Sequence, residues 1–358
     1  MQGFATSGMG AQTPRSATRV SMSVGRVGLL PALIAASALA LADEPSPLDG
    51  YPGRLVDIGS HALHLDCRGQ GSPVVVLESG IGGFSLEWRT VHSALAMRMR
   101  VCAYDRAGYG WSEPGPAPRT ARRNAEELHA LLGVAGERPP YILAGHSYGG
   151  LVVRLFAERY ASEVAGLALI DAAAPEQFER LPAAVLPRAL IAALGRGGRV
   201  MSVPQHAAGF PPALATLGQQ LMMLPKARAA YVEEMRWFEA SARQLLHQRD
   251  GALSAPLVVL SRARREFDGT LDNSGAEDVW RDMQARMSLL STNTDHWIAA
   301  GAGHQIHADR PDLVLLALTE VARAGVRSVD IADDPFGLQL VAAIPTAPRL
   351  VYSSWLPQ

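Results

Sequence analysis

Short continuous apolar runs recur along the middle of the chain and alternate with longer stretches in which apolar residues return every three or four positions. Continuous runs are typical of strands buried on both faces of a sheet, and the longer spacing is typical of helices packed against it. The predicted buried strands are 73–77, 101–104, 141–144, 165–170, 256–261 and 296–300. The predicted helices are 86–97, 120–132, one that follows Gly149 at once, 276–290 and 311–324. This alternation predicts an α/β fold, with a mostly parallel sheet, helices on both faces and a ligand site beyond the carboxyl ends of the strands.

Two segments depart from this alternation. Residues 54–58 and 62–67 predict two short strands that form a hairpin. Residues 176–250 are rich in leucine, alanine, methionine and proline and show no strand pattern, so we expect a helical cap inserted into the sheet domain. The predicted segments are a first core part at 51–175, the cap at 176–250, a second core part at 251–326, and an extension at 327–358 to which the sequence assigns no role.

The N-terminal region has the order of a secretory signal. The basic residues Arg15, Arg19 and Arg26 precede an apolar run at 27–42. This run ends in alternating alanine and leucine before an acidic residue. This order predicts a signal peptide at 1–42 and an exported protein. The run is shorter than the ~20 residues that cross a bilayer, and Pro31 interrupts it, so export is favoured over the alternative of a permanent N-terminal membrane anchor. Both Met1 and Met22 remain candidate start residues.

Composition excludes two classes of protein. The chain has 358 residues, of which 48% are hydrophobic, so it can bury a large core and is not expected to be disordered. Its net charge is −1 and it has no basic cluster, which argues against a nucleic-acid partner. Cys67 and Cys102 form a disulfide if the protein is exported, or remain buried thiols in a reducing compartment; the sequence leaves both open and slightly favours the free thiols. It indicates no metal site and no oligomeric state.

The most informative stretch is Gly145-His146-Ser147-Tyr148-Gly149, which stands between a predicted strand and a predicted helix. The glycines permit a very tight turn, on which Ser147 is expected to take a strained conformation with its hydroxyl above the strand end. This arrangement is the nucleophile-elbow pattern G-x-S-x-G. It makes Ser147 the candidate nucleophile.

Four blocks in order carry a resemblance to the α/β-hydrolase superfamily, of the AB hydrolase-1 type with a helical cap. They are Glu78-Ser79-Gly80-Ile81-Gly82-Gly83, Asp105-Arg106-Ala107-Gly108-Tyr109-Gly110-Trp111-Ser112, Gly145-His146-Ser147-Tyr148-Gly149 and Gly301-Ala302-Gly303-His304. The resemblance covers roughly 54–326. Each block is weak alone, but four in this order on alternating strands and helices are specific for the fold.

The resemblance implies a triad in the order serine, acid, histidine. His304 is the expected base, because it follows a late strand and glycines. The side chain of His146 is expected to point away from Ser147, and His307 is expected to face solvent. Many members of the superfamily carry the acid after the strand that is 256–261 here, where Glu266 and Asp268 lie among arginines. Others carry it after the preceding strand, where Asp171 stands, and we favour Asp171 while Glu266 remains the alternative.

The resemblance also implies an oxyanion hole made by the backbone N–H groups of Ile81 and Tyr148. The first block departs from the superfamily, in which His-Gly is usual and this chain has Ser79-Gly80. A backbone donor is unaffected by this change, but a side chain that often braces the loop is lost. Asp105 and Arg106 are expected to brace the active-site face rather than to take part in catalysis.

Together these features predict a serine hydrolase that cleaves an ester or related acyl bond through an acyl-enzyme, with no cofactor. An acyltransferase or a carbon–carbon bond hydrolase would use the same residues. A non-catalytic binding protein of this fold is a further alternative, although it would have no physical reason to keep all three triad groups. An epoxide hydrolase or dehalogenase would carry aspartate at the elbow, so Ser147 argues against both.

The cap bears on the substrate. Its methionines at Met222, Met223 and Met235 suit an irregular apolar acyl chain, or else they pack the cap on the core. No cluster of charge and no aromatic platform for a sugar is evident. We therefore expect a small, mostly apolar small-molecule substrate.

Overall fold

The computed structural model describes residues 52–182, 209–267 and 275–328. The predicted signal peptide at 1–42, the two candidate start residues, Asp268, part of the predicted cap and nearly all of the C-terminal extension lie outside these residues. Among the described residues, no helix combines the length and the apolar character needed to cross a membrane.

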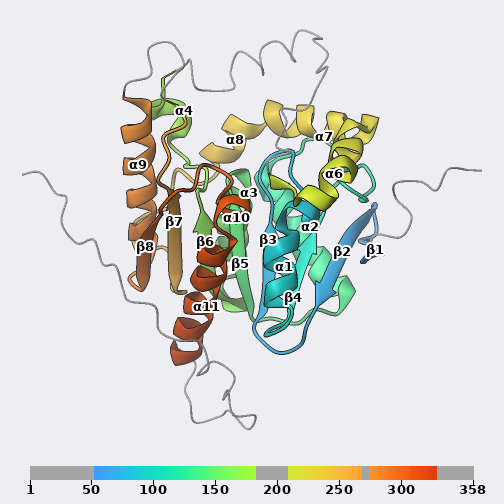
Figure 1. Ribbon diagram of the computed structural model, residues 1–358, viewed down its shortest axis with the longest axis horizontal. Helices are drawn as coiled ribbons and strands as arrows, with labels where there is room; N and C mark the ends of the chain where they lie inside the picture. Colours follow the sequence, from blue (N-terminus) through green and yellow to red (C-terminus); the bar gives the residue numbers. More distant parts are fainter. Residues whose placement is uncertain (1–51, 183–208, 268–274, 329–358) are drawn as a thin grey trace, which may run out of the picture. The chain divides into compact units, whose positions relative to one another are not determined.

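The core is an eight-stranded sheet with the order β1-β2-β4-β3-β5-β6-β7-β8 (Figure 1). The strands are β1 (Arg54–Asp57), β2 (Ala62–Arg68), β3 (Val74–Glu78), β4 (Val101–Tyr104), β5 (Tyr141–His146), β6 (Val164–Ile170), β7 (Leu257–Arg262) and β8 (Thr294–Ala299). The strands from β3 to β8 are parallel, whereas β1 and β2 form the predicted antiparallel hairpin. The predicted fold class is thus confirmed. Strand β8 begins two residues before the predicted apolar run, because this edge strand is only partly buried and its first residues are polar.

Helices cover both faces of the sheet. One face carries α1 (Arg89–Leu95) and α11 (Pro311–Ser328), and the other carries α2 (Ala121–Ala135), α3 (Tyr148–Arg159) and α9 (Ala276–Met287) (Figure 1). The strand residues alternate accordingly: Val74 and Val76 of β3 belong to the cluster under α2 and α3, while Val75 and Leu77 belong to the cluster under α1 and α11. Strands with two buried faces need apolar residues at every position, which explains the continuous runs in the sequence.

Helix ends follow local signals in the sequence. The side chain of Thr120 accepts a hydrogen bond from the Arg123 N–H at 3.3 Å and caps α2. Gly136 ends the same helix in the left-handed conformation. The helix expected at 86–97 instead starts with the 3₁₀ turn η1 (Ser85–Trp88) before α1; such turns are common at helix N-termini.

The described residues between β6 and β7 form helices and no strand. These helices are α4 (Gln177–Arg180), η4 (Pro212–Leu214), α6 (Ala215–Met223), α7 (Pro225–Arg236) and α8 (Phe238–Arg243). Pro212 and Pro225 each open a helix, where a missing N–H costs nothing. Helices α6, α7 and α8 lie along the upper end of the sheet (Figure 1). The extent of the cap, 176–250, stays a prediction.

Cys67 and Cys102 form a disulfide. They face each other across the antiparallel pair β2 and β4, where the register makes them direct partners. The alternative of two buried free thiols is therefore wrong. The sequence could not decide the matter, because the pairing depends on the register of strands that are far apart in the chain.

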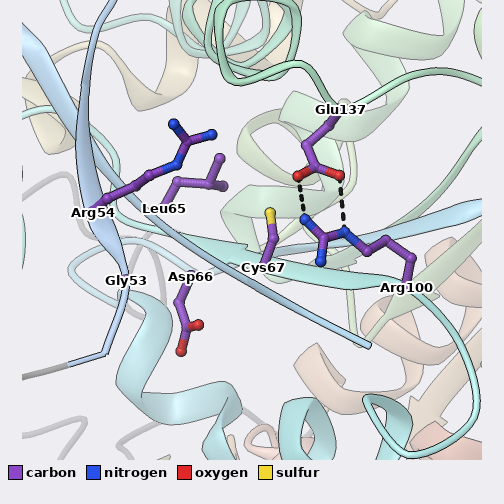
Figure 2. Close-up of a pocket in the computed structure, with 7 residues that line it drawn as sticks. All are labelled: Gly53, Arg54, Leu65, Asp66, Cys67, Arg100 and Glu137. Carbon is purple, nitrogen blue, oxygen red and sulfur yellow. Dashed lines mark hydrogen bonds and ion pairs between the residues drawn. The ribbon is translucent and has the colours of Figure 1, made fainter. Parts of the chain in front are cut away.

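A pocket of about 200 Å³ lies beside this disulfide (Figure 2). It is lined by Gly53, Arg54, Leu65, Asp66, Cys67, Arg100 and Glu137. Arg100 precedes β4 and Glu137 precedes β5, so the pocket lies at the amino ends of the parallel strands. An ion pair of 2.5 Å between the two side chains crosses it. Ligands of open α/β sheets bind at the carboxyl ends of the strands, so the functional site is expected at the opposite end of the sheet from this pocket.

Candidate active site

Ser147 occupies the sharp turn between β5 and α3 with φ 50° and ψ −121°. A non-glycine residue in this region is strained, which is the conformation expected of an elbow. A Cβ on Gly145 would lie 2.6 Å from the Gly149 carbonyl oxygen, and a Cβ on Gly149 would lie 2.6 Å from the Ser79 carbonyl oxygen. Both positions therefore require glycine. The turn is tied to the end of β6 by hydrogen bonds from the Ser147 N–H to the Ile170 carbonyl (3.2 Å) and from the Ala173 N–H to the Ser147 carbonyl (2.9 Å).

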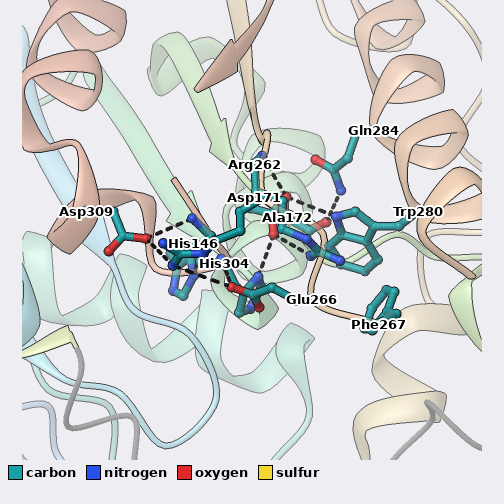
Figure 3. Close-up of polar contacts among 12 residues, drawn as sticks. His146, Asp171, Ala172, Arg262, Glu266, Phe267, Trp280, Gln284, His304 and Asp309 are labelled. Atoms are coloured by element: carbon teal, nitrogen blue, oxygen red, sulfur yellow. Dashed lines mark hydrogen bonds and ion pairs between the residues drawn. The ribbon is translucent and has the colours of Figure 1, made fainter. Parts of the chain in front are cut away.

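Asp171 and His304 meet at the carboxyl end of the sheet. His304 Nδ1 lies 2.6 Å from Asp171 Oδ2, although 133 residues separate them in the chain (Figure 3). Asp171 is fully buried and follows β6 with a φ of 41°, a second strained non-glycine residue at this edge. The His304 side chain is 23% exposed, so it remains accessible to a ligand. The structure thus brings together the expected base and the favoured acid.

Glu266, the alternative acid, contacts the backbone of the same loop. Its Oε1 accepts the His304 N–H at 2.7 Å, and Asp309 Oδ2 accepts the Gly303 N–H at 2.8 Å (Figure 3). The charge of Asp309 is paired with Arg264 at 2.8 Å. Two carboxylates therefore hold the loop that carries the His304 imidazole, one on each of two successive backbone N–H groups.

Asp171 is surrounded by hydrogen-bond donors besides His304. Its Oδ1 accepts the Trp280 indole N–H at 2.9 Å and the Arg262 backbone N–H at 3.2 Å, and its Oδ2 accepts Arg262 Nη1 at 2.8 Å. Burial by itself would raise the pKa of Asp171. The charge of Arg262, with the bonds from His304 and Trp280, outweighs burial and lowers this pKa to about 2. Asp171 is therefore a carboxylate at every pH at which the protein is expected to act.

The predicted oxyanion loop packs against the elbow. The Gly83 N–H donates to the Gly80 carbonyl at 3.0 Å, which closes a turn with Ile81 and Gly82 at its centre, and Gly82 has the positive φ (78°) that such a turn favours. A Cβ on Gly80 would lie 3.3 Å from the Ser147 Cβ. Tyr148 is the first residue of α3, and N–H groups of a first helical turn have no acceptor within the helix. The two expected donors thus belong to segments that flank Ser147.

Arg106 and Trp88 brace this loop. Arg106 donates to the Ser79 carbonyl at 2.7 Å and to the Gly80 carbonyl at 2.8 Å, and the Trp88 indole N–H donates to Ser79 Oγ at 3.0 Å. The Gly80 N–H points to Glu87 Oε1 at 3.4 Å. These contacts brace the loop in a chain that has Ser79 where the superfamily usually has a histidine. The sequence predicted a bracing role near Arg106 but missed Glu87 and Trp88, which looked like ordinary helix positions.

Arg106 also joins the predicted cap to the sheet. Its guanidinium contacts Glu78 of β3 at 2.6 Å and Glu234 of α7 at 2.7 Å, and all three side chains are buried. Glu234 further accepts the Tyr109 hydroxyl at 2.8 Å and the Asn124 amide at 3.0 Å. The described part of the cap is therefore fixed to the strand ends by a buried ionic network next to the oxyanion loop.

His146 and His307 form a buried cluster with Glu87 behind the elbow. His146 Nε2 lies 2.9 Å from the His304 carbonyl oxygen, and the rings of His146 and His307 are 4.6 Å apart. The expectation that His307 faces solvent is wrong, because α10 (Ile306–Asp309) places its ring 4.7 Å from the Trp88 ring. Ligand atoms of Glu87, His146 and His307 lie within 4.8 Å of one another, and these residue types could hold a metal ion. The other such set among the described residues contains the disulfide cysteines.

We expect Glu87 to make the stability of the protein depend on pH. Burial raises the pKa of Glu87 from 4.5 to about 7, against the opposite effects of a hydrogen bond from Ser79 and the charge of Arg106. Because this pKa is higher in the folded protein than in the unfolded chain, the folded state binds more protons between these two values. The free energy of unfolding therefore falls as the pH rises through this window, by on the order of 3 kcal/mol.

We expect Glu87→Gln to remove most of this dependence, since an amide does not titrate. Urea unfolding of both proteins at about pH 5 and about pH 8, with EDTA present, measures the difference. Glu78 acts in the same direction, because burial raises its pKa to about 6, and it is unchanged in the variant. A variant that loses as much stability with rising pH as the wild-type protein would show that Glu87 is not the titrating group.

Comparisons with known proteins support the fold described above. The sequence model of the alpha/beta hydrolase fold matches residues 73–199. The Bacillus subtilis protein YqjL, described only as uncharacterized, is 28% identical over 262 residues, which are 73% of this chain and 88% of that protein. A thermophilic esterase from Thermogutta terrifontis has a TM-score of 0.56 at 21% identity, covering 77% of this chain and 99% of its own. The epoxide hydrolase CorEH has a TM-score of 0.56 at 18% identity, covering 76% and 98%.

The chain therefore has the α/β-hydrolase fold. At these identities the solved structures establish the fold and leave the reaction open, since one is an esterase and the other an epoxide hydrolase. The reaction has to be inferred from the residues at the carboxyl ends of the strands.

Proposed function

We propose that this α/β-hydrolase is a serine hydrolase that cleaves an ester or related acyl bond of a small, mostly apolar substrate through an acyl-enzyme on Ser147. The observation that carries the proposal is the 2.6 Å contact between His304 Nδ1 and a fully buried Asp171, at the sheet edge where Ser147 occupies a strained elbow. An elbow with aspartate would favour the epoxide hydrolase reaction, and this chain has serine.

Each group has a defined task in this reaction. His304 takes the proton of the Ser147 hydroxyl as its oxygen attacks the substrate carbonyl, and Asp171 orients the imidazole and stabilises its cation. The N–H groups of Ile81 and Tyr148 donate to the oxygen on which negative charge develops, a contribution worth roughly 10²–10³-fold per donor. His304 then protonates the leaving alcohol. A water molecule, activated in the same way, releases the acid from Ser147.

The same residues would serve an acyltransferase or a carbon–carbon bond hydrolase, which differ in the acceptor or the bond cleaved. A non-catalytic binding protein is the alternative from another class. The described charged residues around the site favour a neutral substrate, because Arg262 is paired with Asp171 (2.8 Å), Arg264 with Asp309 (2.8 Å), and Glu266 with a backbone N–H (2.7 Å). Met222 and Met235 are buried in the core cluster, so of the methionines considered for substrate contact only Met223, at 49% exposure, lies at the surface.

The first test uses purified protein with p-nitrophenyl esters that range from acetate to laurate. We expect measurable turnover and a preference among the apolar acyl chains. The described charged residues near His304, which are Arg262, Arg264 and Glu266, already have partners within the protein, so they are not available to bind a charged substrate. Better turnover of a charged or strongly polar substrate than of every apolar ester would contradict the substrate class.

A fluorophosphonate reagent followed by peptide mass spectrometry tests the nucleophile independently of the substrate. The adduct is expected on Ser147. Absence of both labelling and ester turnover in folded protein would favour the binding protein instead.

We further propose that the protein is exported, with the alternative that its N-terminal segment anchors it in the membrane. The order of basic, apolar and small residues at 1–42 supports export, and so does the Cys67–Cys102 disulfide, since such bonds persist in oxidising compartments. Fractionation of the native host distinguishes the outcomes: soluble protein outside the inner membrane supports export, membrane-bound protein supports the anchor, and protein in the cytosol contradicts both.

A further inference from the structure

Arg262 occupies an unusual place beside the proposed acid. It is the last residue of β7, next to the strand that Asp171 follows, and only 2% of its side chain is exposed. Both its backbone N–H (3.2 Å) and its Nη1 (2.8 Å) donate to the Asp171 carboxylate (Figure 3). A charged side chain is costly to bury at a strand end unless it has compensating partners.

The guanidinium is held from its other side by Glu277 of α9. Arg262 Nε and Nη2 each donate to one Glu277 oxygen at 3.1 Å, and Glu277 is fully buried. The rings of Phe267 and Trp280 lie 4.6 and 4.7 Å from the guanidinium carbon. These contacts fix the guanidinium so that it cannot leave Asp171 without breaking the pair with Glu277.

Glu277 also organises the loop that reaches His304. Its Oε2 accepts the backbone N–H groups of Glu266 (3.1 Å) and Phe267 (3.3 Å), and Glu266 in turn accepts the His304 N–H. One chain of contacts therefore runs from Glu277 through Arg262 to the carboxylate of the proposed acid. A second runs from Glu277 through Glu266 to the backbone of the proposed base.

The buried charges nearly balance. Asp171 and Glu277 are carboxylates and Arg262 is a cation, so the set carries one net negative charge while His304 is neutral. When His304 takes the proton of Ser147, the set becomes neutral. In a buried site such a charge balance is worth far more than in water.

We propose that Arg262 is a positioning residue of the triad, which keeps Asp171 ionised and directed at His304, and that Glu277 is the counterion that sets how strongly Arg262 acts on it. This inference rests on the proposed function, because it requires Asp171 to serve as the acid. The groups that face Asp171 are Arg262 from β7, Trp280 from α9 and His304 from the loop after β8. Glu277 and Glu266 lie one contact further away.

The pH dependence of kcat/KM separates this role from mere packing. Its acid limb reports proton uptake by the Asp171–His304 pair as a unit. Loss of the Arg262 cation makes protonation of the pair easier, so the limb moves to higher pH, by about one unit. Without the negative charge of Glu277, the Arg262 cation stabilises the Asp171 carboxylate more strongly. The acid limb then moves to lower pH. If Arg262 and Glu277 only contributed to packing, their replacement would leave the acid limb at the wild-type pH.

The central variant is Arg262→Met with Glu277→Met. Changing both residues avoids leaving Arg262 or Glu277 buried without the other, which would be strongly destabilising. Asp171 keeps its contacts with Trp280 and His304 in this variant. Thermal unfolding checks that the variant is folded. We expect kcat to fall by roughly 100-fold, with an upward shift of the acid limb, as is typical of coupling between contacting residues.

Two single variants complete the design. Glu277→Gln should move the acid limb to lower pH. Arg262→Lys keeps the charge but not the paired geometry, so its acid limb should stay at the wild-type position while kcat is low. These two decide the matter if the double variant does not fold. Wild-type limb positions in all folded variants would overturn the inference. Lack of Ser147-dependent turnover in the wild-type protein would instead overturn the proposed function.

Discussion

Ser147→Ala is expected to lower kcat for ester hydrolysis by roughly 10⁶-fold, the cost of removing the nucleophile from a triad of this kind. The residual rate would come from binding and from the N–H donors of Ile81 and Tyr148. The fold should be unaffected, since the change removes one hydroxyl from a partly buried position and keeps the Cβ on the strained backbone. We expect a change in unfolding free energy within about 0.5 kcal/mol.

The measurement is turnover of the best ester, together with fluorophosphonate labelling and urea unfolding. Ser60→Ala is the matched control, because it removes the hydroxyl of an exposed residue in the turn between β1 and β2, far along the sheet from the elbow; this hydroxyl contacts His61 Nδ1 at 2.9 Å. Activity that survives in Ser147→Ala, or equal labelling of the two variants, would exclude Ser147 as the nucleophile.

The order and type of the sheet elements could be predicted because burial on both faces leaves a clear signal. Continuous apolar runs located the strands from β3 to β7, and the helical spacing between them located α2, α3, α9 and α11. Turn chemistry located the elbow. The edge strand β8 and the short first helix were predicted less well, because partial burial and a 3₁₀ turn weaken both periodicities.

The contacts within the site could be predicted only in part. Motif order indicated Ser147 and His304, and strand ends narrowed the acid to two places. The partners of the acid were not indicated: Arg262 lies 91 residues from Asp171 and Trp280 lies 109 residues away, and spacing in the chain says nothing about side chains that meet across a sheet edge. The one available signal was an arginine at the end of an otherwise apolar strand, Leu257–Arg262.

Asp171→Asn is expected to lower kcat by roughly 10⁴-fold at neutral pH, as loss of the acid does in other triads. An amide has nearly the same shape, but it carries no charge to stabilise the His304 cation and can present an N–H where Nδ1 needs an acceptor. The 2.6 Å contact would then hold the imidazole in the wrong tautomer or be lost. The buried set of residue 171, Arg262 and Glu277 would also change from one net negative charge to neutral, so circular dichroism and thermal unfolding must accompany the kinetics.

Glu266→Gln is the matched variant that decides between the two candidate acids. The carboxylate of Glu266 accepts the backbone N–H of His304 at 2.7 Å, and a glutamine carbonyl oxygen can accept the same bond. We therefore expect a loss of about tenfold or less, corresponding to the difference between a charged and a neutral acceptor. A crippling effect of Glu266→Gln beside a mild effect of Asp171→Asn would reverse the assignment. The direct contact of Asp171 with the imidazole, against the contact of Glu266 with the backbone, predicts the opposite order.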